Sequence, residues 1–140
     1  MRTDGLPDFA PRFESDLVRP FWDAIRRGEL CLPCCSECGK WQWYPNEFVT
    51  CHPDANHIWK SIATTGRVFT FTVVHRSFLP NADRGAEPYI SALVEPDGLE
   101  GVRIPAVLTE LAVSDVRIGM QVKLKPLVRS DYVLPAFCPN

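Results

Sequence analysis

One segment, residues 66–76, restricts the fold more than any other part of the sequence. It is filled by β-branched and aromatic residues, contains no proline and starts with a glycine, a combination that predicts a β-strand. Phe69, Phe71 and Val73 share one face of this strand, and the other face is also largely apolar, so we expect both to be covered. A long first strand of this kind predicts a small closed barrel, because it must pair with both halves of the sheet.

Shorter segments with strand character follow. They are residues 88–95, 102–108, 120–125 and 132–137. The polar segment 78–87 is expected to be a loop, and Ser114 can cap a short helical turn that Gly119 ends. Three strands, a short helix and two strands is the order of an OB-fold, a five-stranded Greek-key barrel. The sequence therefore predicts a mainly β protein with this barrel in residues 66–140.

Residues 1–34 are expected to form an extended arm followed by an amphipathic helix. The apolar stripe of this helix consists of Leu17, Phe21 and Ile25. Ser15 and Asp16 are candidate caps, Pro20 suits a first helical turn, and Gly28 suits the position after a helix end. The stripe could pack on the chain's own barrel or on a partner chain, since a short helix on such an arm is poorly retained alone.

Residues 35–65 carry the spacing of a zinc ribbon. Cys35 and Cys38 are separated by two residues and followed by a glycine, which is the form of a zinc knuckle. The second knuckle is expected at Cys51 and Asp54, so the predicted zinc ligands are three thiolates and one carboxylate. Alternatives for the fourth ligand are His52, His57 and Cys34.

The predicted role of this zinc is structural, because nothing in the segment marks an activated water or a general base. Without a metal, the hairpin would depend on Trp41, Trp43 and Tyr44. Cys31 and Cys138 fall outside the spacing and are expected to be ordinary thiols.

Composition excludes several classes of function. The chain has 140 residues, of which 46% are hydrophobic, enough for one compact domain with a core. The net charge is −2 and there is no basic run, which argues against binding nucleic acid by phosphate neutralisation. The N-terminus lacks a signal-peptide stretch and no segment has the length of a membrane span, so we expect a soluble, cytoplasmic protein. Six cysteines in that compartment suggest metal ligands or buried thiols rather than disulfides.

In the order and spacing of its motifs, the chain resembles the DUF35 family, which joins a rubredoxin-like zinc ribbon to an acyl-CoA-associated OB-fold. The segments that carry the resemblance are residues 20–24, 35–39, 51–53, 66–76, 88–95, 116–120 and 134–137. The departure is Asp54, where the family usually has a fourth cysteine. The resemblance implies an accessory subunit that pairs with a thiolase-superfamily enzyme (a thiolase, an acyltransferase or a steroid side-chain aldolase), as a hetero-oligomer expected to be α2β2. The partner would carry the catalytic residues, and this chain would help to shape its acyl-CoA site.

Possible contacts to the phosphates of coenzyme A are Lys60, Arg67, Arg76 and Arg84, although scattered basic side chains more often lie on a solvated surface. An alternative function is a stand-alone acyl-CoA-binding module. A third is single-stranded nucleic-acid binding, which would need basic residues interleaved with exposed aromatics. Phe69 and Phe71 are aromatic, but their strand is not basic.

Overall fold

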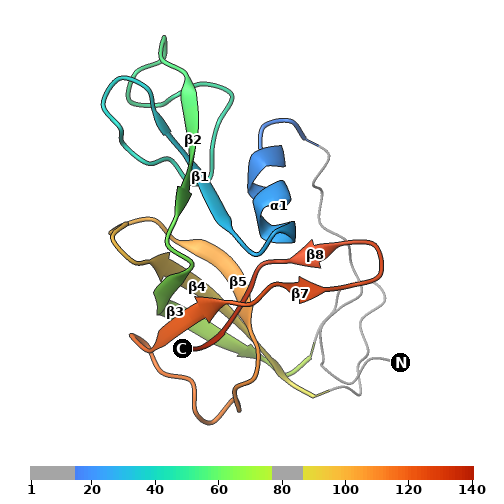
Figure 1. Ribbon diagram of the computed structural model, residues 1–140. Helices are drawn as coiled ribbons and strands as arrows, with labels where there is room; N and C mark the ends of the chain where they lie inside the picture. The colour runs from blue at the N-terminus through green and yellow to red at the C-terminus, as the bar shows by residue number, and fades with distance from the viewer. Residues whose placement is uncertain (1–14, 77–86) are drawn as a thin grey trace.

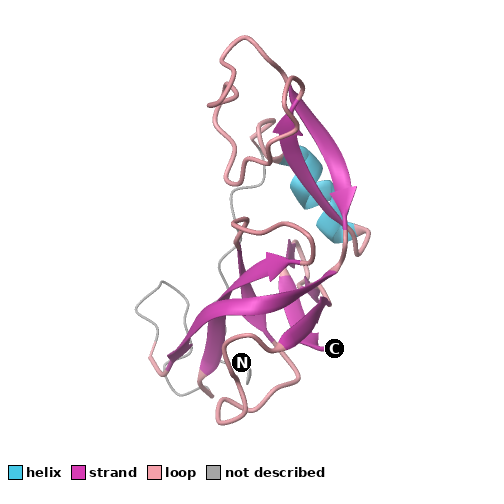
Figure 2. Ribbon diagram, turned by 90° about the vertical axis from the view of Figure 1, so that its left-hand side faces the viewer, coloured by secondary structure: helices cyan, strands magenta, loops and turns pink. Residues whose placement is uncertain are grey.

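The computed structural model describes residues 15–76 and 87–140, so the expected N-terminal arm and most of the expected loop 78–87 lie outside the described residues. The elements are α1 (Arg19–Arg26), β1 (Leu30–Cys35), β2 (His57–Ile62), β3 (Thr65–Val74), β4 (Tyr89–Pro96), β5 (Ile104–Leu108), β6 (Gln121–Leu124), β7 (Leu127–Val128), β8 (Val133–Leu134) and β9 (Ala136–Pro139). A hairpin of β1 and β2 rises from a barrel formed by the later strands, with α1 beside it (Figures 1 and 2).

The barrel is closed, with the strand order β3-β4-β5-β9-β6, which confirms the predicted OB-like fold. The first strand serves both halves of the sheet, because β3 pairs with β6 over Thr65 to Arg67 and with β4 along nearly its whole length. A register shift between Val68 and Thr70 bends it. Gly66 allows the strands to approach, since a Cβ there would lie 2.5 Å from the carbonyl oxygen of Glu95.

Two details of the barrel prediction are wrong. The segment around Ser114 forms turns instead of a helix, and its end is held to β3 by the N–H of Gly119, which donates to the carbonyl of Val68 at 2.8 Å. The expected fifth strand is divided at Pro135. Its first part is β8, which pairs with β7, and only β9 joins the barrel. A proline has no N–H for a strand ladder, which explains the break.

The helix lies close to its predicted position. Pro20 stands in its first turn, and Gly28, with φ of 74°, follows its end as expected. The expected cap is wrong, because Val18 occupies the N-cap position and no side chain caps the helix. Phe21 and Ile25 are buried in one core cluster with residues of β1 and the barrel, so the apolar stripe packs on the chain's own core. Within the described residues, no helix is long and apolar enough to cross a membrane.

Candidate functional site

The cysteine-rich segment folds around a compact group of four side chains that could hold a metal ion. Cys35 ends β1, Cys38 lies in the turn that follows, and Cys51 and His52 lie in the loop leading to β2. One ligand atom from each lies within 4.8 Å of the others. The Sγ atoms of Cys38 and Cys51 are 3.6 Å apart, and the Sγ of Cys35 is 3.4 Å from Nδ1 of His52.

A tight backbone turn brings Cys35 and Cys38 to the same point. The N–H of Gly39 donates to the carbonyl of Cys35 at 2.9 Å, and the N–H of Cys35 donates to the carbonyl of Lys40 at the same distance. Gly39 has φ of 74°, a conformation that suits glycine. Within the turn the N–H of Glu37 donates to the Sγ of Cys35 at 3.3 Å. The turn therefore has the form of the knuckle that the sequence predicts.

The spacing of the four ligand atoms fits a tetrahedral zinc ion. Zn–S bonds of about 2.3 Å and Zn–N bonds of about 2.0 Å place neighbouring ligand atoms about 3.5–3.8 Å apart. The separations of 3.6 Å between two sulfurs and 3.4 Å between sulfur and nitrogen lie close to this range. The cluster could therefore bind a metal such as zinc. Four protein ligands would leave no open position, which suits a structural ion.

The thiols of the cluster hold their protons unequally. Burial opposes ionisation of Cys35, but hydrogen bonds from the backbone N–H groups of Cys38 and Glu37, and then from the thiols of Cys51 and Cys38, lower the pKa of Cys35 to about 6. Burial, and then hydrogen bonding with Cys38 and Cys35, raise the pKa of Cys51 to about 11. Cys35 therefore ionises at a lower pH than Cys51 and offers a cation an anionic ligand.

The other residues considered for the fourth ligand lie outside this group. His52 contributes the fourth ligand atom of the cluster, whereas Asp54 is an exposed residue that is not a member of it. Nε2 of His57 lies 2.8 Å from a backbone carbonyl oxygen in the same loop. Cys34 is buried beside Cys35 on β1, and consecutive residues of a strand point to opposite faces, which turns its thiol away.

An apolar groove of about 330 Å³ opens between α1, the loop after the knuckle, and the barrel. Its lining residues are Phe21, Trp22, Trp43, Tyr44, Arg103, Pro105 and Pro135. The aromatic rings form a continuous series, because the ring centroids of Phe21 and Trp43 are 4.5 Å apart and those of Trp43 and Tyr44 are 5.4 Å apart. Tyr44 remains 61% exposed. The groove thus joins a buried aromatic anchor to an exposed ring.

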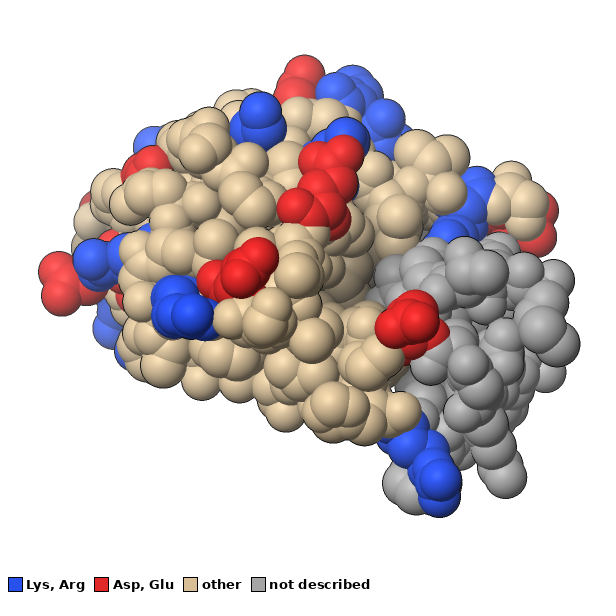
Figure 3. All heavy atoms as spheres, turned by 90° about the horizontal axis from the view of Figure 1, so that it is seen from below, with Lys and Arg blue, Asp and Glu red and all other residues tan. Residues whose placement is uncertain are grey.

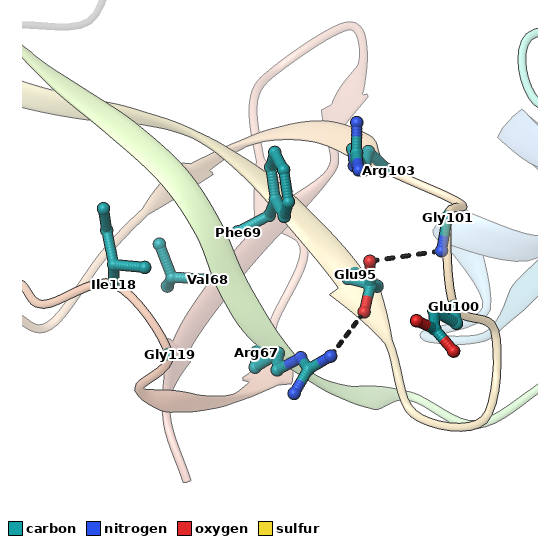
Figure 4. A pocket seen from close by; sticks show the side chains of 9 residues that line it. All are labelled: Arg67, Val68, Phe69, Glu95, Glu100, Gly101, Arg103, Ile118 and Gly119. Carbon is teal, nitrogen blue, oxygen red and sulfur yellow. Dashed lines mark hydrogen bonds and ion pairs between the residues drawn. The ribbon is translucent and has the colours of Figure 1, made fainter.

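A second pocket, of about 430 Å³, lies on the barrel wall beside β3 (Figure 4). Arg67 donates to the nearly buried carboxylate of Glu95 at 2.8 Å, and the N–H of Gly101 donates to its other oxygen at 3.2 Å. The hydrogen bond from Arg67, and then that from Gly101, lower the pKa of Glu95. The Cζ of Arg103 lies 3.7 Å from the centroid of the Phe69 ring, a cation–π contact.

Among the basic residues considered as coenzyme A contacts, the three that the structure describes are not gathered at one place. Lys60 lies on β2, Arg67 near the start of β3 and Arg76 just beyond its end. The ten residues of β3 span about 30 Å at the usual rise per residue, so the two arginines lie at opposite ends of the strand. Arg84 lies outside the described residues. On the face shown in Figure 3, Lys and Arg side chains are interspersed with Asp and Glu rather than forming a basic stripe. Contact with coenzyme A stays a prediction.

The sequence did not single out the barrel half of the groove. Arg103, Pro105 and Pro135 meet aromatic residues from the first third of the chain, and no local pattern announces such a long-range meeting. Pro105 and Pro135 were assigned only to the expected strands 102–108 and 132–137. Trp43 and Tyr44 were singled out, but only as residues that would hold the hairpin together without a metal.

The comparisons with known proteins agree with this architecture. Residues 59–125 match the family model described as ChsH2, C-terminal OB-fold domain. A chain of the solved structure of the "Ltp2-ChsH2(DUF35) aldolase" is 26% identical, with a TM-score of 0.78, and the match covers 93% of this chain and 98% of that one. A DUF35-family protein of unknown function from Sulfolobus solfataricus is 14% identical, with a TM-score of 0.60, covering 92% and 89% respectively. No curated protein matches the chain.

Fold and site together define a class: a mainly β protein in which a hairpin with a Cys/His cluster is joined to a closed OB-like barrel. The resemblance to the DUF35 family that the sequence suggested is confirmed by the family model and by the first structural neighbour, and the second neighbour shares the fold. The chain is similar to a DUF35 component of an aldolase, which supports an OB-fold accessory subunit.

Proposed function

We propose that this chain is a non-catalytic accessory subunit that binds and stabilises a thiolase-superfamily enzyme acting on acyl-CoA substrates. The observation that carries the proposal is the similarity to a chain of the Ltp2-ChsH2(DUF35) aldolase, which extends over 98% of that chain. A match of this extent includes the hairpin and helix as well as the barrel, so it goes beyond a shared OB-fold. That aldolase is named for two components, Ltp2 and ChsH2, which supports a partner for this chain as well.

The apolar groove is the surface that we assign to the partner. Aromatic residues are enriched in the central contacts of protein interfaces, where they carry much of the binding energy. Trp22, Trp43 and Tyr44 line the groove, and the exposed ring of Tyr44 leaves apolar area for a partner to cover. Arg103 stands at the same groove and could pair with an acidic residue of the enzyme. The sequence also predicts that the helix with Phe21 and Trp22 and the knuckle hairpin form much of the interface with the partner, and both segments line this groove.

A zinc ion held by Cys35, Cys38, Cys51 and His52 would have a structural role in this subunit. It would fix the loop that carries Trp43 and would take no part in the reaction. The acyl-CoA substrate would bind mainly to the enzyme, with basic residues of this chain at the entrance of the channel. We expect the complex to be a cytoplasmic α2β2 hetero-oligomer.

Co-expression with the thiolase-superfamily protein encoded by a neighbouring gene tests the proposal. We expect the two chains to co-purify and to elute as one species whose mass is measured by light scattering. We also expect thioester turnover to require both chains. The proposal is wrong if the neighbouring protein is stable and fully active alone and forms no complex with this chain.

The second candidate is a stand-alone acyl-CoA-binding module. It is favoured by the pocket beside β3, where the guanidinium of Arg103 lies over the exposed ring of Phe69 and could meet an anionic, partly apolar ligand. Calorimetry of the isolated chain with coenzyme A thioesters separates the two candidates. Micromolar binding without a partner, lost in an Arg103→Ala variant, would favour the module over the subunit.

A further inference from the structure

Two thiols of the metal cluster, those of Cys38 and Cys51, are adjacent, as a tetrahedral metal site requires, but they are also exposed, which such a site does not require. We propose that Cys38 and Cys51 form a site of oxidative modification, at which a hydroperoxide converts the two thiols into a disulfide and so displaces the metal ion. The inference concerns this chain alone and does not depend on the partner. It does take the cluster as the metal site assigned above.

Accessibility distinguishes this pair from the other cysteines. Cys38 and Cys51 are exposed, while Cys34, Cys35 and Cys138 are buried and Cys31 is half-buried. A hydroperoxide in solution can therefore reach the Sγ atoms of the exposed pair first. Oxidation of cysteine follows exposure and thiolate character. In a metal-bound cluster every cysteine ligand would be a thiolate, so exposure, which separates Cys38 and Cys51 from Cys35, decides which pair reacts.

The geometry permits a bond between these two sulfurs. Their separation of 3.6 Å must shorten to about 2.05 Å, a closure of about 1.5 Å. Cys38 lies in the turn after β1, and Cys51 lies in a stretch of turns and bends rather than in a strand. Small side-chain rotations in two loops can supply this movement without breaking a strand ladder.

Cys35 is a poorer partner for the same reaction. It is the last residue of β1, and its Sγ accepts the N–H of Glu37 at 3.3 Å and lies 3.4 Å from Nδ1 of His52. These contacts hold the sulfur in a buried position. The exposed pair is therefore expected to be linked in preference to any pair that includes Cys35.

The reaction balances with one hydroperoxide as the oxidant. One thiolate attacks the outer oxygen, the O–O bond breaks, and a sulfenic acid forms while the remaining oxygen leaves, after protonation, as an alcohol (water when the oxidant is hydrogen peroxide). The second thiolate attacks the sulfenic sulfur, the S–S bond forms and the sulfenic oxygen leaves as water. In total, two thiolates, one hydroperoxide and two protons give one disulfide, one alcohol and one water. The sulfurs are oxidised by two electrons, and the peroxide is reduced by two.

The disulfide removes two of the four ligands of the cluster, because its sulfurs are no longer thiolates. Cys35 and His52 alone cannot complete a tetrahedral site, so the metal should leave. The loop between Cys38 and Cys51 stays closed, since the new bond joins the same two residues that the metal had joined.

Peptide mapping of the full-length, zinc-loaded chain after treatment with hydrogen peroxide tests the proposal. Digestion with trypsin and a glutamate-specific protease separates Cys38 from the other cysteines, because cleavage follows Glu37, Lys40, Glu47 and Lys60. We expect residues 38–40 to be linked to residues 48–60, two of the six thiols to be lost, and about one equivalent of zinc to be released to a chromogenic chelator. Dithiothreitol and zinc should restore the starting state.

Several outcomes would overturn the proposal. It fails if the thiols persist in millimolar peroxide even in metal-free protein, if residues 30–37 are linked instead, or if the disulfide joins two chains on a non-reducing gel. A Cys51→Ser variant should lose the link, whereas a Cys31→Ser variant, altered outside the cluster, should keep it. If Cys51→Ser does not fold, the peptide map of the unaltered protein still decides the question.

Discussion

Replacing Tyr44 by alanine should weaken binding of the partner enzyme much more than replacing Phe48 by alanine. The two residues make a matched pair, because both lie in the knuckle loop and both are large aromatics, exposed to 61% and 57% respectively. They differ in position, since Tyr44 lines the apolar groove and Phe48 does not. A difference between the two variants therefore reports on the groove rather than on loss of an aromatic ring.

The exposed fraction sets the size of the expected effect. An aromatic side chain buries about 200 Å² when it is fully covered, so a partner could cover about 120 Å² of Tyr44. At about 25 cal/mol per Å² this is about 3 kcal/mol, or about a 100-fold increase in Kd on removal of the ring. The part already buried in the free chain is about 80 Å² for each residue, so both variants should lose at most about 2 kcal/mol of folding stability.

Two measurements check this reasoning. Titration calorimetry with the co-purifying enzyme gives Kd for each variant, and urea denaturation of the free chain gives the free energy of unfolding. We expect similar losses of stability for the two variants and a large increase in Kd for Tyr44→Ala alone. Equal Kd values for the two variants would refute the assignment of the groove as the interface.

Three further predictions concern the barrel and the cluster. Gly66→Ala should lower the free energy of unfolding by about 1–3 kcal/mol, seen as a lower urea midpoint, because the new Cβ would meet backbone atoms of the neighbouring strand. Because the hydrogen bond from Arg67 lowers the pKa of Glu95 in the folded state, the pair should stabilise the protein above the ordinary carboxyl pKa of about 4.3 and lose this effect as the pH falls below it. Glu95→Gln should flatten that acid limb in urea midpoints measured from pH 3 to 6; an unchanged limb would contradict the assignment. His52→Ala should weaken zinc binding by at least about tenfold in a chelator competition, whereas Asp54→Ala should leave it unchanged.

The barrel could be predicted because its pattern is local. Residues 66–76 have the composition of a long strand, and a first strand of that length can pair with both halves of a small closed sheet. The expectation that both faces of this strand are covered is wrong, because Phe69 is 40% exposed on one of them. The division at Pro135 was harder to foresee, because the strand propensity of the flanking residues outweighed one proline. The segment that begins at Ser114 was predicted as a helical turn but forms non-helical turns. The prediction was wrong because a serine hydroxyl can hydrogen-bond to nearby backbone groups at a turn as well as at a helix cap.

The sequence identified those members of the metal cluster whose spacing is fixed by a tight turn. Cys35 and Cys38 flank a turn that a two-residue interval specifies, so sequence alone identified them. The fourth member depends on how a longer loop folds back. By analogy with the first knuckle the sequence favoured Asp54, but the geometry brings in His52, next to Cys51. The groove could not be predicted, because it joins residues more than 50 positions apart.

The metal cluster and the groove are connected through the loop between them. Residues 36–56 form turns and bends, joined to β1 by the bridge between Cys34 and Trp41. A two-stranded hairpin such as β1 and β2 is marginally stable alone, so it cannot by itself hold a loop of this length in one position. On one side, Trp43 contacts Phe21 of α1, which is buried in the core cluster. The loop that carries Trp43 also begins and ends at the cysteines of the metal cluster, which restricts it from the other side. A metal at the cluster would therefore stabilise the apolar groove without contacting it, because the metal would restrict the loop that forms one wall of the groove.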